Sequence, residues 1–212
     1  MSEQSAVAID GLAEAAGKRE RSKAANRQAI LDAARRVFSQ LGYEAASVRD
    51  VIRGTDLASG TFYNYFKSKE ELLEALQDDG ARRFRPILRA EVERAQSFDD
   101  FVRGALVAYF RFITEEHAET GGLALGHHAV WHVDTPEMVA VFDEVREGIV
   151  RVLGDARAQA IDADYFAAAS IGLAREVGLR MLSRSPKEPE AAAQFCADLL
   201  LGGVAGLAAR RT

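Results

Sequence analysis

Apolar side chains recur at steps of three and four residues along most of the chain, which is the spacing that places them on one face of an α-helix. The first clear stripe runs from Ala29 to Leu41, and similar stripes follow Asp100, Glu137 and Asp162. No segment alternates apolar and polar residues as a half-buried strand does. The pattern therefore predicts an all-α protein.

The first helix is predicted to begin near residue 26. Residues 1–25 mix alanine, glycine and charged side chains without a sustained apolar stripe, so they are predicted to form a flexible tail. The stripe that begins at Ala29 ends at Leu41, and Gly42 then suits the left-handed turn that closes a helix.

Two short helices are predicted to follow. Ser47 with Asp50 three residues later is a capping-box signal for a helix over residues 47–53. After a break, residues 59–66 are predicted to form a third helix, with Phe62 directed inward and polar residues on the other faces. Two short helices joined by a tight turn are typical of a helix-turn-helix unit that reads DNA.

The rest of the chain predicts a helical body. Ser68 with Glu71 is a cap for a fourth helix, which Pro86 is expected to kink or interrupt because proline has no backbone N–H to donate. Ser97 opens a helix with a strongly aromatic face, and Thr135 opens the next. An aromatic face of this kind fills a core or lines a cavity for a small molecule. Its members are Phe98, Phe101, Tyr109, Phe110 and Phe112.

Charge is unevenly distributed along the 212 residues. The net charge is −5, yet residues 18–70 hold eleven basic and six acidic side chains. A basic first third on an acidic body is expected where one module meets a polyanion and the other does not. The basic end of the tail, residues 18–27, suits a phosphate backbone or a minor groove, and equally a solubilising tail.

A cytoplasmic protein is the expectation. The single cysteine, Cys196, excludes an internal disulfide and a Cys-rich zinc site. The first residues lack the features of a signal peptide, and the apolar stretch 197–209 is shorter than the roughly 20 residues that span a bilayer. We therefore expect no membrane segment and no cofactor.

A group of histidines raises the question of a metal site. His128 and His132 stand four residues apart and so share a helical face, a spacing that suits zinc or nickel, and Asp134, Glu137 and His117 are further candidates. No Glu follows the first histidine as a metalloprotease helix requires. We predict neither a catalytic nor a metal site. The alternatives left open are structural histidines, contacts to a ligand, and a helical metal-dependent enzyme or metallosensor.

Three segments carry a resemblance to a known family. They are AILDAA at residues 29–34, SVRDV at 47–51 and GTFYNYFKSKEELL at 60–73, with Phe38 and Gly42-Tyr43 between them. Together they resemble the DNA-binding domain of the TetR (tetracycline repressor) family. Asp56 stands where the family usually has a turn glycine, a position where Asp tolerates a left-handed conformation. Ala58 stands where the family usually has the Ser that caps the recognition helix, so Ser59 is expected to take over that cap.

The resemblance, together with side-chain chemistry, divides the expected DNA contacts into two groups. Those expected on phosphates are Ser47, Thr61, Tyr65 and Lys69. Those expected to face the bases or their sugars are Arg49, Ser59, Gly60, Tyr63 and Asn64. The alternatives are that the tyrosines cover the rim of the core and that Arg49 pairs with Asp50 or Glu44.

The resemblance also implies an architecture of about nine helices, with a DNA-binding domain at residues 26–72 and a ligand-binding and dimerisation domain at 73–212. Small residues in the last two helices favour a homodimer that joins them to their copies. These residues are Ala167, Ala168, Ala169, Gly172, Gly178, Gly202, Gly203 and Gly206.

The function expected from this architecture is a ligand-responsive transcriptional regulator. It would be a repressor that binds a palindromic operator in double-stranded DNA and is released by a partly apolar small molecule. The residues expected at the ligand are Phe101, Tyr109, Phe112, His117, His128, Trp131 and His132. A second possibility within the same fold is an activator that needs no effector.

Overall fold

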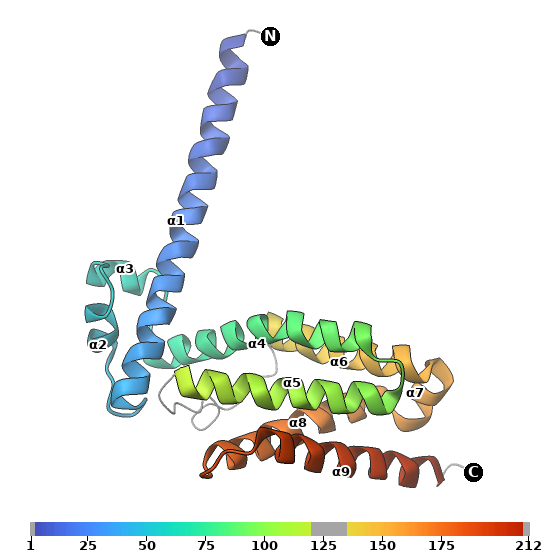
Figure 1. Ribbon diagram of the computed structural model, residues 1–212. Helices are drawn as coiled ribbons and strands as arrows, with labels where there is room; N and C mark the ends of the chain where they lie inside the picture. Colours follow the sequence, from blue (N-terminus) through green and yellow to red (C-terminus); the bar gives the residue numbers. More distant parts are fainter. Residues whose placement is uncertain (1–2, 120–134, 210–212) are drawn as a thin grey trace. The chain divides into compact units, whose positions relative to one another are not determined.

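The computed structural model describes residues 3–119 and 135–209 of the chain. Within these residues all regular structure is helical and comprises nine helices (Figure 1), which confirms the predicted fold class. The chain divides into two compact units, Met1–Leu72 and Leu73–Thr212.

The first unit contains α1 (Glu3–Leu41), α2 (Val48–Arg53) and α3 (Ser59–Tyr63). The apolar stripe predicted for the first helix is its buried face. The space between α1 and α2 is tight at Gly54, where a Cβ atom would lie 3.4 Å from Cβ of Ala33. The fully or almost fully buried side chains of the unit include Ile30, Leu31, Ala34, Phe38, Val51, Phe62 and Phe66.

The start of α1 differs from the prediction. The helix begins at Glu3 rather than near residue 26, so the backbone of the expected tail is helical. Every side chain from Gly17 to Ala25 is exposed. The prediction relied on an apolar stripe, whereas alanine, lysine, arginine and glutamate favour a helix through their intrinsic propensity alone.

The ends of α1 and α2 follow the sequence signals. Gly42 adopts φ +77°, the left-handed conformation predicted at the end of α1. The Ser47 hydroxyl accepts a hydrogen bond from the Asp50 N–H at 3.3 Å, and the Asp50 carboxylate accepts one from the Ser47 N–H at 2.9 Å. The Ser47 hydroxyl and the Ser47 N–H both donate to the Asp50 carboxylate, and these two hydrogen bonds lower the pKa of Asp50. The predicted capping box is therefore confirmed.

The predicted details of α3 need three corrections. The helix ends at Tyr63 rather than Phe66. Its N-cap is Ala58, which makes no side-chain hydrogen bond, and Ser59 already lies inside the helix and so does not act as the cap. Within the described residues only Asp162 among the non-glycine residues has a positive φ, so Asp56 does not adopt the left-handed conformation that was expected of it.

The second unit contains most of α4 (Lys69–Arg94), together with α5 (Phe98–Glu119), α6 (Pro136–Leu153), α7 (Asp155–Ile161), α8 (Ala163–Leu182) and α9 (Pro189–Ala209). The predicted caps at Ser97, Thr135 and Asp162 each accept a hydrogen bond from a backbone N–H three residues later. The short α7 was not predicted, because it carries only two buried apolar residues.

Pro86 does not interrupt α4, which continues through it to Arg94. The carbonyl that loses its hydrogen-bond partner belongs to Arg82, four residues earlier. Both Pro86 and Arg82 are exposed, so water can hydrate that carbonyl. The prediction of an interrupted helix was wrong for this reason.

Two apolar clusters form the core of the second unit. The first gathers residues of α4, α5, α6, α7 and α8 around Leu88, Phe101 and Ile149. The second joins α5, α8 and α9 around Phe110 and Cys196. Burial raises the pKa of Cys196 to about 11, so its thiol is protonated and unreactive at neutral pH. The aromatic face of α5 contributes to both clusters.

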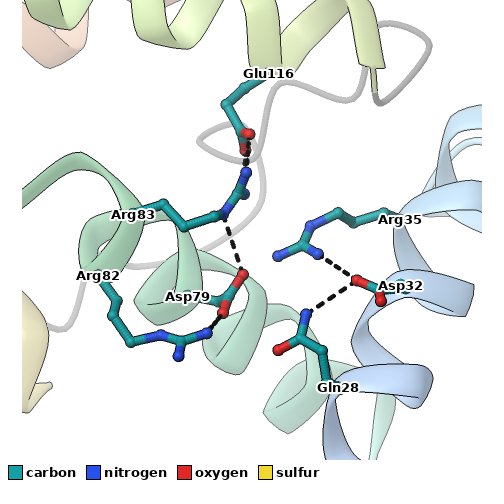
Figure 2. Close-up of polar contacts among 7 residues, drawn as sticks. All are labelled: Gln28, Asp32, Arg35, Asp79, Arg82, Arg83 and Glu116. Atoms are coloured by element: carbon teal, nitrogen blue, oxygen red, sulfur yellow. Dashed lines mark hydrogen bonds and ion pairs between the residues drawn. The ribbon is translucent and has the colours of Figure 1, made fainter. Parts of the chain in front are cut away.

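Ion pairs join α4 to its neighbours within the second unit. Figure 2 shows Arg83 between Asp79 and Glu116: its Nε lies 3.3 Å from Oδ2 of Asp79, and its Nη2 lies 2.6 Å from Oε2 of Glu116. Arg89 binds both carboxylate oxygens of Glu144 on α6, at 2.7 and 3.0 Å. Asp79 is almost fully buried, and Arg82 and Arg83 supply the counter-charge that a buried carboxylate needs.

Candidate functional site

An exposed polar face covers α2, α3 and the turn that follows α3. On the inner side of α3, Phe62 is only 1% exposed and packs against the Phe66 ring with centroids 6.0 Å apart. A helix anchored by one buried aromatic residue presents its other side chains outward, as a helix-turn-helix unit requires. Of the nine predicted DNA contacts, the exposed ones are Ser47, Arg49, Ser59, Gly60, Tyr63 and Asn64, and the partly buried ones are Thr61, Tyr65 and Lys69.

The structure also bears on the alternatives for the aromatic and charged members of this face. Tyr63 is 56% exposed, so most of its ring extends beyond the rim of the core. Asp50 pairs with Arg53 at 3.6 Å and with the Ser47 hydroxyl. Arg49 is exposed beside them on α2.

Lys69, at the start of α4, is held inside the first unit. Its Nζ donates hydrogen bonds to the carbonyls of Tyr43 at 2.8 Å and Ala46 at 3.2 Å, and it lies 4.2 Å from the centroid of the Tyr43 ring. An ammonium group has three donors, and Nζ also lies 3.5 Å from the carbonyl oxygen of Glu44, so all three donors are directed to the turn between α1 and α2. These hydrogen bonds were not predicted, because every residue has a backbone carbonyl and the sequence does not show which carbonyls Lys69 reaches.

A cavity of about 210 Å³ lies inside the second unit, among residues of α4, α5, α6, α8 and α9. Four predicted ligand contacts line it, namely Phe101, Tyr109, Phe112 and His117. The other three, His128, Trp131 and His132, lie outside the described residues. The lining from the other helices, such as Leu88, Val141 and Leu179, was not predicted, because nothing in one sequence shows which helices meet.

The wall of the cavity is mostly apolar and carries a small set of polar side chains. These are Gln77, Tyr109, Glu116, His117, Ser170 and Arg175. Burial raises the pKa of Tyr109 to about 12, which keeps its hydroxyl neutral. Burial and the charge of Lys187 lower the pKa of His117. The cavity therefore combines the neutral Tyr109 hydroxyl and the His117 imidazole with the side chains of Glu116 and Arg175.

With this geometry in view, the chain can be compared with known proteins. Residues 30–76 match the family described as bacterial regulatory proteins, tetR family. This segment is a TetR-family DNA-binding segment. The matched residues include α2, α3 and the first turns of α4, so the exposed polar face lies within the TetR-family segment.

Named relatives match part of the chain. It is 30% identical over 105 residues to the uncharacterized HTH-type transcriptional regulator YhgD of Bacillus subtilis, covering 45% of the chain and 55% of that protein. It is 38% identical over 97 residues to the HTH-type transcriptional repressor ComR of Escherichia coli, covering 45% and 44%. The match thus spans about half the length of these curated relatives.

The whole fold also has solved counterparts. The fatty acid degradation regulator FadR from Bacillus halodurans superposes with a TM-score of 0.65, covering 84% of this chain and 95% of that one at 22% identity. At this identity the likeness shows the fold alone.

The surface of α8 and α9 exposes several large apolar side chains. Tyr165, Phe195 and Leu199 are 78%, 58% and 54% exposed. A Cβ atom added at Gly172, Gly202 or Gly203 would meet nothing within 4 Å.

Not every small residue of these helices lies on that outer surface. A Cβ atom at Gly178 would lie 2.7 Å from Cδ1 of Ile113, and Ala167 is fully buried. These two positions serve packing within the subunit, contrary to the expectation that they face a partner. Side chains of residues 205–209, which include Gly206, lie outside the described set.

The described residues also bear on metal binding and on membrane insertion. Among them, no group of three or more His, Cys, Asp or Glu side chains is arranged to hold a metal ion. None of the helices there combines the length and apolar composition that a membrane span requires. The pair His128 and His132 lies outside the described part of the chain.

Proposed function

We propose that this TetR-family protein is a ligand-responsive repressor that binds a palindromic operator in double-stranded DNA as a homodimer. The observation that carries the proposal is the exposed polar face of α3, anchored from below by Phe62, within the segment that matches the family. Repression rather than activation of transcription is supported by relatives such as ComR of Escherichia coli and AcnR of Corynebacterium glutamicum, both named repressors.

In this proposal residues 26–72 form the DNA-binding domain, and its contacts divide by chemistry. Hydroxyl and ammonium groups bind phosphates and set the register, whereas side chains on the exposed face of α3, together with Arg49, face the bases. The residues assigned to phosphates are Ser47, Thr61, Tyr65 and Lys69. The residues assigned to the bases are Arg49, Ser59, Gly60, Tyr63 and Asn64.

Residues 73–212 form the ligand-binding and dimerisation domain. The exposed aromatic and aliphatic side chains of α8 and α9 are costly in water and are the surface we assign to the partner subunit. A two-fold dimer would place two α3 helices about 34–36 Å apart, on successive major grooves.

The effector site in this proposal is the cavity of the second unit. Its apolar wall with a few polar side chains favours a compact, largely apolar molecule with one polar end. The helix α4 contributes Gly80 and Phe84 to the cavity and begins at Lys69. Effector binding would shift the dimer towards states that no longer fit the operator.

The variant Gly80→Leu tests the effector site. Gly80 lines the cavity, and a Cβ atom there meets nothing within 4 Å, so a leucine side chain can enter the empty space. Replacing glycine in a helix interior also favours the helix by about 0.5–1 kcal/mol. We expect the variant to bind DNA like the wild type but to resist release by any compound that releases the wild type in a fluorescence-anisotropy screen.

Gly80→Ala is the matched control, because its single methyl group leaves most of the cavity open. It should still respond to the same compounds. If a compound releases wild type and Gly80→Leu at equal concentrations, the effector does not bind in this cavity.

A further inference from the structure

The N-terminal part of α1 carries a set of basic side chains that the helix-turn-helix contacts do not use. Residues 18–27 contain five basic residues and one acidic residue, and all five basic side chains are exposed. Figure 1 shows this part of α1 continuing past α2 and α3. We propose that one face of it, formed by Arg19, Lys23 and Arg27, binds backbone phosphates of duplex DNA beyond the segment that α3 reaches. This inference rests on the proposed DNA-binding function.

The three residues share a face because they are spaced by four along a continuous helix. The same face continues through Leu31, Ala34 and Phe38, which are buried in the core of the first unit. At about 100° per residue, the basic stripe therefore lies on the side of α1 that holds α2 and α3, and not on the side turned away from them.

A cation–π contact joins this stripe to the candidate DNA interface. The guanidinium carbon of Arg27 lies 5.4 Å from the centroid of the Phe66 ring. Phe66 directly follows Tyr65, one of the residues assigned to a phosphate. The stripe thus starts beside the C-terminal end of the α3 region and leads away from it.

The length of the stripe suits a few additional phosphates. From Arg27 to Arg19 the helix rises by about 12 Å, since each residue adds about 1.5 Å. Duplex DNA rises by about 3.4 Å per base pair, so this length matches about three or four base pairs. Exposed lysine and arginine side chains release counterions when they bind phosphates, and this makes the contact measurable through its salt dependence.

Two other basic residues of α1 provide a matched control. Lys18 and Arg21 are also exposed and basic, but at about 100° per residue they point away from the face that carries Arg19 and Lys23. Each pair contains one lysine and one arginine, so neutralising either pair changes the net charge equally. A merely solubilising role would make the two pairs equivalent.

The experiment compares Arg19→Gln/Lys23→Gln with Lys18→Gln/Arg21→Gln in the full-length protein. Glutamine has nearly the helix propensity of lysine and arginine, so both variants should keep α1 helical, as circular dichroism would verify. Affinity for a fluorescent random-sequence duplex of about 40 base pairs, long enough for both half-sites and their flanks, is measured between 50 and 200 mM salt.

We expect the first variant to lose about 1.8 from the slope of log affinity against log salt for each bound protomer, since each phosphate contact contributes about 0.9. The second variant should lose less than half as much. Equal losses in the two variants, or no loss in the first while the wild type binds, would overturn the assignment of this face. A wild-type protein that shows no affinity for duplex DNA would instead overturn the proposed function, and this inference with it.

Discussion

Ser59→Asp is expected to abolish DNA binding while leaving the protein at least as stable as the wild type. Ser59 is exposed at the first position of α3, and the N-cap Ala58 supplies no side-chain acceptor. A carboxylate in the first turn of a helix is favourable by about 0.3–1 kcal/mol because it meets the positive end of the helix dipole. If α3 enters a major groove, the same carboxylate would lie in the negative potential of the DNA, and like-charge repulsion at an interface costs several kcal/mol.

The predicted loss of affinity is at least about 100-fold, which corresponds to about 2.8 kcal/mol. It is measured on operator DNA and on random duplex by anisotropy, with a thermal melt of each protein. Ser59→Asn is the matched control, because asparagine has nearly the size of aspartate without its charge, and its affinity should fall much less. An affinity for Ser59→Asp within threefold of the wild type would show that α3 does not face DNA.

Lys69→Met is expected to weaken both the fold of the first unit and its binding to DNA. Methionine keeps much of the apolar stem but removes the hydrogen bonds to the carbonyls of Tyr43 and Ala46 and the contact with the Tyr43 ring. Hydrogen bonds that involve a charged group contribute about 1.5–3 kcal/mol, and Lys69 is half-buried, so we expect a loss of about 2 kcal/mol in the free energy of unfolding.

The salt dependence of binding separates the two roles of Lys69. If Lys69 exchanges its longest hydrogen bond, to the Glu44 carbonyl at 3.5 Å, for one to a phosphate, Lys69→Met lowers the slope of log affinity against log salt by about 0.9 per protomer on every sequence. Lys67→Met is the control, because Lys67 is exposed and neutralising it removes the same charge two residues away. A destabilised Lys69→Met protein with an unchanged salt slope would restrict this residue to holding the turn between α1 and α2.

Local signals in the sequence predicted the helix ends well because both partners of each interaction are close along the chain. Ser47 with Asp50, Gly42, Thr135 and Asp162 all act as their sequence neighbours indicate. These signals depend on hydrogen bonds across three or four residues, which one sequence displays completely.

The failures have a different physical origin. The start of α1 was missed because helix propensity without a buried face leaves no stripe, and Pro86 was misjudged because its exposure to water was unknown. Contacts between distant segments explain two further omissions. They are the hydrogen bonds from Lys69 to two carbonyls and the lining of the cavity by Leu88 and Leu179. Such contacts follow from the packing of helices, which the periodicity of each helix does not reveal.

The central claim is that the exposed face of α2 and α3 reads duplex DNA in a two-fold symmetric pair. Selection of bound molecules from a random-sequence duplex library by the purified full-length protein tests it most directly. We expect enrichment of one inverted repeat with half-sites centred about 34–36 Å apart. The Ser59→Asp protein should not enrich that repeat. A selected pool that stays as diverse as the starting library, or an enriched site without two-fold symmetry, would contradict it.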